Sequence, residues 1–280
     1  MRPRARFCFF LGLIGWTMLG PGQAAGPPDR SWQPLFNGKN LDGWYVVVRS
    51  VRTNDPGPLV HVEDGAIHMY PEATDASAQP VGYIVTDKEY ANYHLRLEYK
   101  WGTKRFAQRA QVRRDAGILY HVVGKDGVWP RSVECQIQEK DVGDIFTVNT
   151  RITGFVDPAT TKQVPIVITN EAGKVLTNQS APVYLPAAKG GIPFARGTAK
   201  GIQRLIRSPM NEHDGWNTVE VIVRGDRATY IVNGVVNNEA TKIEEMVDEK
   251  WRPLVKGKIA LQFEYAEVFY CNVEIQELTE

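Results

Sequence analysis

The sequence predicts an all-β protein that folds as a two-sheet jelly-roll sandwich. From Trp32 onward, short runs rich in Val, Ile, Tyr and Phe are bounded by Gly, Pro, Asp and Asn, which is typical of strands joined by turns. In the clearest run, Tyr93–Trp101, apolar and polar residues alternate with a period of two. So many strands without helices between them must close into a sandwich or a barrel, because a single open sheet would leave one apolar face in water. We expect the sandwich.

The strands can be placed individually. We expect them at Tyr45–Arg49, Leu59–Val62, Ala66–Tyr70, Tyr83–Thr86, Tyr93–Trp101, Ala116–Val123, Ser132–Gln138, Thr218–Val223, Arg227–Val232, Gly257–Glu264 and Val268–Ile275. The pairs Asp64-Gly65 and Gly225-Asp226 tolerate the positive φ of tight turns, so each is expected to join two strands as a hairpin. Only Thr241–Trp251 has the pattern of a short helix.

The segment 139–214 has a looser pattern, with Gly, Pro, Asn and Thr and only isolated β-like pieces. A stretch of this length without a clear period is unusual inside a domain and is commonly functional. We expect a loop-rich insertion that covers one face of the sandwich.

The first 25 residues have the features of a signal peptide. Three arginines lie within Met1–Arg6, and Phe7–Gly20 is a nearly unbroken apolar run. The run is short for a membrane span, and the small residues that follow it suit signal peptidase. We expect cleavage after Ala24 or Ala25, no membrane attachment afterwards, and a periplasmic or secreted protein. An uncleaved N-terminal anchor is the alternative.

Charge and cysteine content limit the partners of the remaining residues, 31–280, which we expect to form one domain. Removing the three N-terminal arginines from 33 Lys and Arg leaves 30 against 32 Asp and Glu in the chain after the expected cleavage site, a net charge of −2. This balance argues against nucleic acid as a partner. Cys135 and Cys271 remain, and an exported compartment permits them to pair, although two buried thiols are the more common arrangement.

Three stretches of the chain resemble the 3-keto-disaccharide hydrolase domain family. The most specific is Leu35–Trp44, Leu-Phe-Asn-Gly-Lys-Asn-Leu-Asp-Gly-Trp; the others are Gly215–Val221 with Asn233-Gly234, and Ile259–Gln262 followed by Asn272–Ile275. The resemblance implies a concanavalin A-like jelly roll in which one concave sheet holds sugar. It also implies an oligosaccharide or glycoside substrate that a separate sugar 3-dehydrogenase has already oxidised at C3.

The densest group of polar residues lies on the expected strand Ser132–Gln138. On a strand, one face would carry Glu134, Gln136 and Gln138. The opposite face, which points into the core, would carry Cys135 and Ile137. Amides can donate to and accept from sugar hydroxyls, and a carboxylate can take a proton, so this row suits a sugar site. The alternative is an ordinary strand facing solvent. The resemblance favours the site, because it places this strand in the sheet that binds ligand.

The same alternation adds further candidates. It puts His121 on one face with Gly117, and Gln262 on one face with Glu264. If both rows belong to the concave side, we expect Glu134 and His121 to be catalytic, with Gln136, Gln138, Gln262 and Glu264 binding substrate. A structural role for His121 is the alternative. Trp129, in an expected loop, is the best candidate for stacking on a sugar ring, although most aromatic residues of a sandwich lie in its core.

A 3-keto sugar permits a simple chemistry. The ketone acidifies the C2 hydrogen, so a Glu or His base can remove it, and the C1 substituent leaves by β-elimination before water adds. Direct hydrolysis by Glu134 and a second carboxylate is the other route. The expected protein is therefore a hydrolase or lyase for 3-keto-disaccharides or 3-keto-glycosides. A non-catalytic, lectin-like carbohydrate-binding module is the alternative.

No cofactor signature is present in the sequence, and we expect none to be needed. Glu139, Asp141 and Asp144 form an acidic cluster that could hold calcium through oxygen ligands. Their spacing fits no strong calcium motif, and a solvated acidic turn is the alternative.

Overall fold

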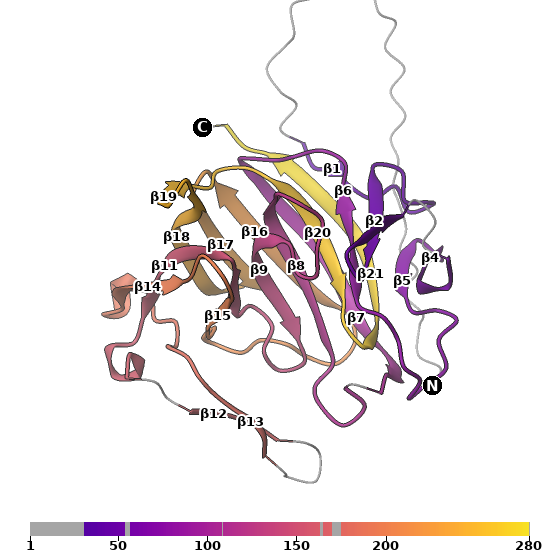
Figure 1. Cartoon of the computed structure of the whole chain (residues 1–280), viewed down its shortest axis with the longest axis horizontal. Helices are drawn as coiled ribbons and strands as arrows, with labels where there is room; N and C mark the ends of the chain where they lie inside the picture. The colour runs from indigo at the N-terminus through magenta and orange to yellow at the C-terminus, as the bar shows by residue number, and fades with distance from the viewer. Residues whose placement is uncertain (1–30, 54–56, 108, 163–164, 170–174, 280) are drawn as a thin grey trace, which may run out of the picture.

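Two antiparallel sheets lie face to face in the computed structural model (Figure 1). The structure describes residues 31–53, 57–107, 109–162, 165–169 and 175–279. The larger sheet has the order β14 (Ile192–Gly197), β11 (Thr150–Val156), β18 (Val235–Val247), β17 (Arg227–Val232), β16 (Asn217–Arg224), β7 (Tyr93–Arg105), β21 (Ala266–Glu277), β5 (Ala66–Met69) and β4 (Val60–Glu63). β1 (Gln33–Pro34) pairs with β21, and β19 (Lys250–Pro253) pairs with β18.

The second sheet has eight strands and carries the polar residues singled out above. Its order is β15 (Ile202–Leu205), β10 (Ile145–Val148), β9 (Arg131–Gln138), β8 (Asp115–Val123), β20 (Lys258–Phe263), β6 (Gly82–Thr86), β2 (Trp44–Val48) and β3 (Val51–Thr53). A separate hairpin of β12 (Pro165–Thr169) and β13 (Val175–Ser180) extends away from both sheets (Figure 1). Short 3-10 turns occur at Gly57–Leu59, Pro158–Thr160 and Ala187–Lys189.

The core lies between the two sheets and follows the period of two in the sequence. On β7, Tyr93, Leu95, Leu97 and Tyr99 are buried in it, while the residues between them are only partly buried. Tyr120 of the eight-stranded sheet and Tyr230 of the larger sheet meet edge to face, and their hydroxyls are hydrogen-bonded at 2.9 Å. The two sheets are therefore joined by apolar burial and by a buried polar contact.

The predicted strands and turns are confirmed. Each expected strand overlaps one in the structure. Asp64 and Gly65 have φ of 49° and 75° in the turn between β4 and β5, and Gly225 has φ of 55° between β16 and β17. The alternation of apolar side chains fixes the strands, and the turn residues fix where each one ends.

Two segments differ from expectation. The helix expected at Thr241–Trp251 is wrong, because these residues form the end of β18, a turn, and the start of β19. The segment 139–214, expected to be rich in loops, contributes β10 and β15 to one sheet and β11 and β14 to the other. Its strands are short and interrupted by Gly and Pro, so a window long enough to detect a period spans more than one element.

Three further expectations concern the signal peptide, membrane attachment and the two cysteines. The expected signal peptide lies outside the described residues. Among the residues that are described, no helix is long and apolar enough to cross a membrane. Cys135 and Cys271 are both buried, and no disulfide joins these two residues.

Candidate active site

A row of polar side chains covers the outer face of the eight-stranded sheet, the face turned away from the core. Cys135 and Ile137 of β9 are buried in the core, so Glu134, Gln136 and Gln138 point to the outer face. This is the alternation that the sequence predicts. All three are almost fully buried, with exposed fractions of 5–6 %.

The neighbouring strands bring more polar groups to this face. β8 pairs Asp115 with Gln138 and Gly117 with Gln136. On the far side of β8, Glu264 forms a bridge to Asp115. Glu134 and Gln262 meet over Gly117, because a Cβ atom at that position would lie 2.1 Å from Oε1 of Glu134 and 3.1 Å from Oε1 of Gln262. The site is therefore assembled from β9, β8 and the end of β20.

One arginine joins two of the carboxylates. Arg109 Nη2 lies 2.5 Å from Oδ2 of Asp115 and 3.0 Å from Oε1 of Glu264. Gln138 Nε2 donates to the same Asp115 oxygen at 2.9 Å, and Gln262 Nε2 donates to Oε2 of Glu264 at 3.4 Å. Asp115 and Glu264 are thus held in place, whereas Glu134 has no ion pair with any cation of the described residues.

Burial and like charges raise the pKa of two carboxyls. Burial, followed by the charge of Glu264, raises the pKa of Asp115 to about 7, although Arg109 opposes this. Burial also raises the pKa of Glu134 well above its ordinary value, and the charges of Asp115 and Glu264 add to the effect. Three carboxyls around a single guanidinium cannot all be ionised cheaply, so this face holds protons near neutral pH.

Several acceptor atoms on this face have no hydrogen-bond partner within the described part of the chain. They are Oδ1 of Asp115, Oε1 of Glu134, Oε1 of Gln136 and Oε1 of Gln262. Buried polar atoms are nearly always paired, and an unpaired one costs about 1–3 kcal/mol. Four on one face indicate a surface built to receive donors from a bound molecule.

The comparison with known proteins assigns the chain to a family. The model of the 3-keto-alpha-glucoside-1,2-lyase-like domain matches residues 31–276. The chain belongs to this family. No curated protein matches this lyase-like domain significantly.

Solved structures resemble the lyase-like domain in fold. A candidate glycosyl hydrolase from Parabacteroides distasonis has a TM-score of 0.52 at 20 % identity, covering 89 % of this chain and 95 % of that one. A β-glucanase from Bacillus licheniformis has a TM-score of 0.44 at 12 % identity, covering 89 % and 98 %. The carbohydrate-binding module CBM66 from Bacillus subtilis has a TM-score of 0.40 at 10 % identity, covering 85 % and 98 %. The two-sheet jelly roll that the sequence predicts is confirmed by the sheets of the structure, and the Parabacteroides distasonis protein shares this fold.

Aromatic side chains flank the polar row of the lyase-like domain. Trp129 is half-buried and packs on Tyr83, with ring centroids 6.3 Å apart, and Tyr83 is the partner of Gln262 in the strand register. Phe146 of β10 pairs with Glu134 in register and carries the guanidinium of Arg204 over its ring at 5.4 Å. The expected stacking residue Trp129 therefore lies at one border of the row, and Phe146, which the sequence did not suggest, lies at the other.

His121 does not join the site, which corrects its expected place beside Glu134. A bulge between Tyr120 and Val123 breaks the alternation of β8, and His121 has φ of 51° within it. The ring lies next to Tyr120, and its Nε2 is 2.9 Å from the carbonyl oxygen of Gly225 in a turn of the other sheet. Burial lowers the pKa of His121 to about 4, so it is a neutral structural residue.

The acidic cluster binds arginines. Glu139 pairs with Arg105 and Arg114, and Asp144 pairs with Arg204 and Arg207. Asp141 also pairs with Arg204, at 3.1 Å. The solvated acidic turn is wrong for Asp141 and Asp144, which are buried, and the carboxylates of all three residues are engaged by guanidinium groups instead of facing a common cavity for calcium. The described residues contain no group of three or more His, Cys, Asp or Glu arranged to hold a metal ion.

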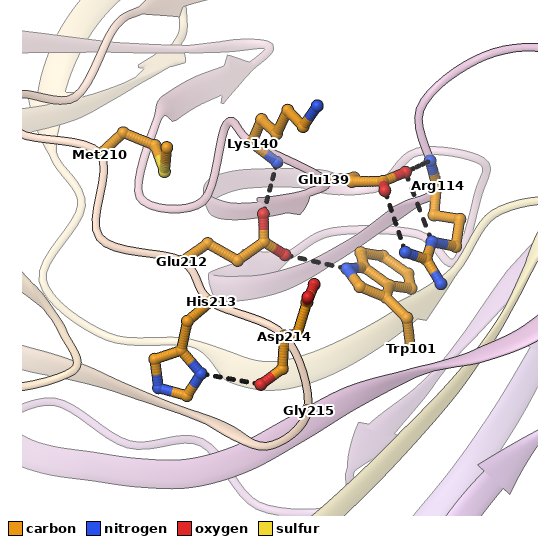
Figure 2. A pocket seen from close by; sticks show the side chains of 9 residues that line it. All are labelled: Trp101, Arg114, Glu139, Lys140, Met210, Glu212, His213, Asp214 and Gly215. Atoms are coloured by element: carbon orange, nitrogen blue, oxygen red, sulfur yellow. Dashed lines mark hydrogen bonds and ion pairs between the residues drawn. The ribbon is translucent and has the colours of Figure 1, made fainter. Parts of the chain in front are cut away.

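A pocket of about 260 Å³ adjoins the ends of the same two strands (Figure 2). Arg114, which precedes β8, and Glu139, which follows β9, form part of its wall. Glu212 accepts hydrogen bonds from Nε1 of Trp101 at 2.9 Å, from Tyr99 at 2.8 Å and from the backbone of Lys140. These bonds hold the turn after β9 against β7 of the larger sheet.

Sequence reasoning missed Asp115 and Arg109. Asp115 has the parity of Gly117 and would have been found if the strand had been extended by one residue at its start. Arg109 lies in the connection between β7 and β8, where no periodic pattern indicates the direction of a side chain.

Proposed function

We propose that this protein is an enzyme that cleaves glycosides oxidised at C3, and that the outer face of the eight-stranded sheet is its active site. The substrate would be a 3-keto-disaccharide or another 3-keto-glycoside, delivered by a separate sugar 3-dehydrogenase. The N-terminal sequence supports a periplasmic or secreted location for this reaction.

The observation that carries the proposal is the set of unpartnered acceptors around Gly117. Within the described part of the chain, Asp115, Glu134, Gln136 and Gln262 each have a buried oxygen without a donor. A sugar ring presents several hydroxyl donors at comparable spacing and would satisfy these atoms together. Trp129 and Phe146 at the two borders supply apolar surface for the faces of the rings.

Glu134 is the group that we assign to proton donation. It is buried, it has no ion pair within the described residues, and burial raises its pKa well above the ordinary value, which favours the protonated form. When the bond between C1 and O1 breaks, O1 leaves with the bonding electron pair and takes the proton of Glu134. Sequence reasoning suggested a base at this position; burial without an ion pair among the described residues favours the acid.

The amide of Gln136 suits the ketone. Its side chain is buried on the same face as Glu134, two residues further along β9. Its amide oxygen has no donor among the described residues. An amide N–H turned toward the C3 oxygen would stabilise the negative charge that develops there on enolisation. Elimination at C1 with later addition of water and direct hydrolysis at C1 both use Glu134 as acid, and we favour elimination because the ketone makes it accessible.

The competing function is a carbohydrate-binding module that uses the same face. Binding needs hydroxyl acceptors and aromatic surface but gains nothing from protonated buried carboxyls. One experiment distinguishes the enzyme from the binding module. Purified protein is incubated with 3-keto-trehalose and, as a control, with unoxidised trehalose. The enzyme releases reducing sugar from the 3-keto substrate only. Binding of either sugar without turnover would support the module and reject the enzyme.

A further inference from the structure

We propose that Asp115 is the base that removes the C2 proton of the 3-keto sugar. This inference rests on the proposed function, and it adds the second catalytic residue, which sequence reasoning did not identify.

The two oxygens of Asp115 have different surroundings. Oδ2 is held by two donors, Arg109 Nη2 at 2.5 Å and Gln138 Nε2 at 2.9 Å. Oδ1 is buried and has no partner among the described residues. A carboxylate fixed through one oxygen, with free lone pairs on the other, is a positioned proton acceptor.

The other carboxyls on this face are less suited to the same role. Glu264 has both oxygens engaged, Oε1 by Arg109 and Oε2 by Gln262. Glu134 forms no ion pair within the described residues, and burial raises its pKa well above the ordinary value although the charge of Arg109 opposes this. Asp115 alone combines a free oxygen with a contact to Arg109, which stabilises the carboxylate once the proton is lost.

Asp115 and Glu134 are placed to act on neighbouring atoms of one sugar. Glu134 lies over Gly117, and Asp115 is two residues from Gly117 on the same face of β8. Residues two apart on a strand are separated by about 7 Å, so both carboxyls can flank the C1–C2 edge of a single ring. A pKa of about 7 for Asp115 leaves much of it ionised at neutral pH, and burial raises the pKa of Glu134 well above its ordinary value.

The step balances without any further reactant. The C2–H bond breaks, the proton goes to Oδ1 of Asp115, and the electron pair forms the enolate of the C3 ketone. The enolate then reforms the ketone and a C1=C2 double bond, and the C1–O1 electron pair leaves on O1, which takes the proton of Glu134. The products are an alcohol and an unsaturated 3-keto sugar. Asp115 returns its proton to solvent, and Glu134 takes one from solvent.

A probe without a leaving group isolates this base. The 3-keto derivative of 1,5-anhydroglucitol has a C2 hydrogen next to the ketone but no substituent to expel at C1. In deuterated water, the wild-type protein should exchange that hydrogen for deuterium faster than buffer alone, as followed by NMR. We expect Asp115→Asn to slow the exchange by about 10²- to 10⁴-fold.

Two further variants keep the test decisive. Asp115→Ala should lose the exchange and regain part of it when formate is added, which a merely structural role would not produce. Glu98→Gln, a carboxyl on the larger sheet, controls for the substitution itself. If Asp115→Asn exchanges as fast as wild type while wild type cleaves 3-keto-trehalose, the assignment of Asp115 is overturned and the proposed function stands. If wild type neither exchanges the probe nor cleaves the substrate, both proposals fail.

Discussion

The carboxyl group of Glu134 occupies the space that a side chain at Gly117 would fill. A Cβ atom at residue 117 would lie 2.1 Å from Oε1 of Glu134, on the neighbouring strand. Gly117 is not among the residues with positive φ, so its backbone would accept an L-residue and the glycine serves to leave room. This space is what allows β9, β8 and β20 to bring their polar groups together.

Gly117→Ala should therefore displace the acid without unfolding the protein. We expect kcat/KM for a 3-keto-glycoside to fall by about 10²-fold, because a shift of about 1 Å in a catalytic group is sufficient for such a loss. Gly127→Ala is the matched control, since the nearest atom to its added Cβ is 3.9 Å away. Steady-state kinetics of both variants provide the measurement, and unchanged kcat/KM in Gly117→Ala would contradict the placement of Glu134.

The parts of the site that follow from alternation could be predicted from the sequence. Glu134, Gln136 and Gln138 needed only the period of β9, and Gln262 with Glu264 needed only that of β20. The expected placement of His121 was wrong because a bulge in β8 turns its side chain toward the other sheet. There it contacts Gly225, about a hundred residues further along the chain. Gly257 leaves space there, since a Cβ on it would lie 2.7 Å from Cα of His121. A local pattern cannot encode that contact.

The residues that were missed depend on tertiary structure in the same way. Arg109 reaches Asp115 and Glu264 from a connection, so only the folded chain shows that it is shared between them. The acidic cluster was recognised, but its partners Arg204 and Arg207 lie some sixty residues further along the chain. The fold was more accessible than the site because every strand repeats the same alternation.

The pH dependence of cleavage should depend on the leaving group. Burial raises the pKa of Glu134 well above its ordinary value, and the proton is lost as the pH rises through the raised pKa. We expect kcat/KM for 3-keto-trehalose to decline at high pH. A 4-nitrophenyl 3-keto-glucoside should lack this decline, because nitrophenolate leaves without a proton. Identical high-pH limbs for the two substrates would argue against Glu134 as the acid.

His121 should make the fold sensitive to acid. Its pKa is lowered from 6.5 to about 4, so between these values the unfolded chain binds a proton that the folded chain does not. Stability is therefore lost as pH falls from 6.5 toward 4, by an amount of the order of 3 kcal/mol. His121→Gln removes this titration and should flatten the dependence, as measured by urea unfolding at several pH values. An equally steep loss in the variant would assign the acid sensitivity elsewhere.

Arg204 should matter more to stability than an exposed arginine in a similar pair. Its side chain is 5 % exposed and pairs with Asp144, which is fully buried, whereas Arg131 is 34 % exposed in its pair with Glu245. Arg204→Met removes one guanidinium partner from the buried carboxylates of Asp141 and Asp144, which keep Arg207, and should cost about 3 kcal/mol. Arg131→Met should cost about 1 kcal/mol or less. Chemical denaturation distinguishes the two, and equal losses would contradict the structural role of Arg204.

The most direct measurement is the turnover of 3-keto-trehalose by wild type and by Glu134→Gln, with Tm recorded for both. Glutamine keeps the size of the side chain but cannot supply the proton. We predict cleavage by wild type, a loss of about 10²- to 10⁴-fold in the variant, and nearly equal Tm values. Full turnover by a folded Glu134→Gln variant would contradict the account and remove Glu134 from the reaction.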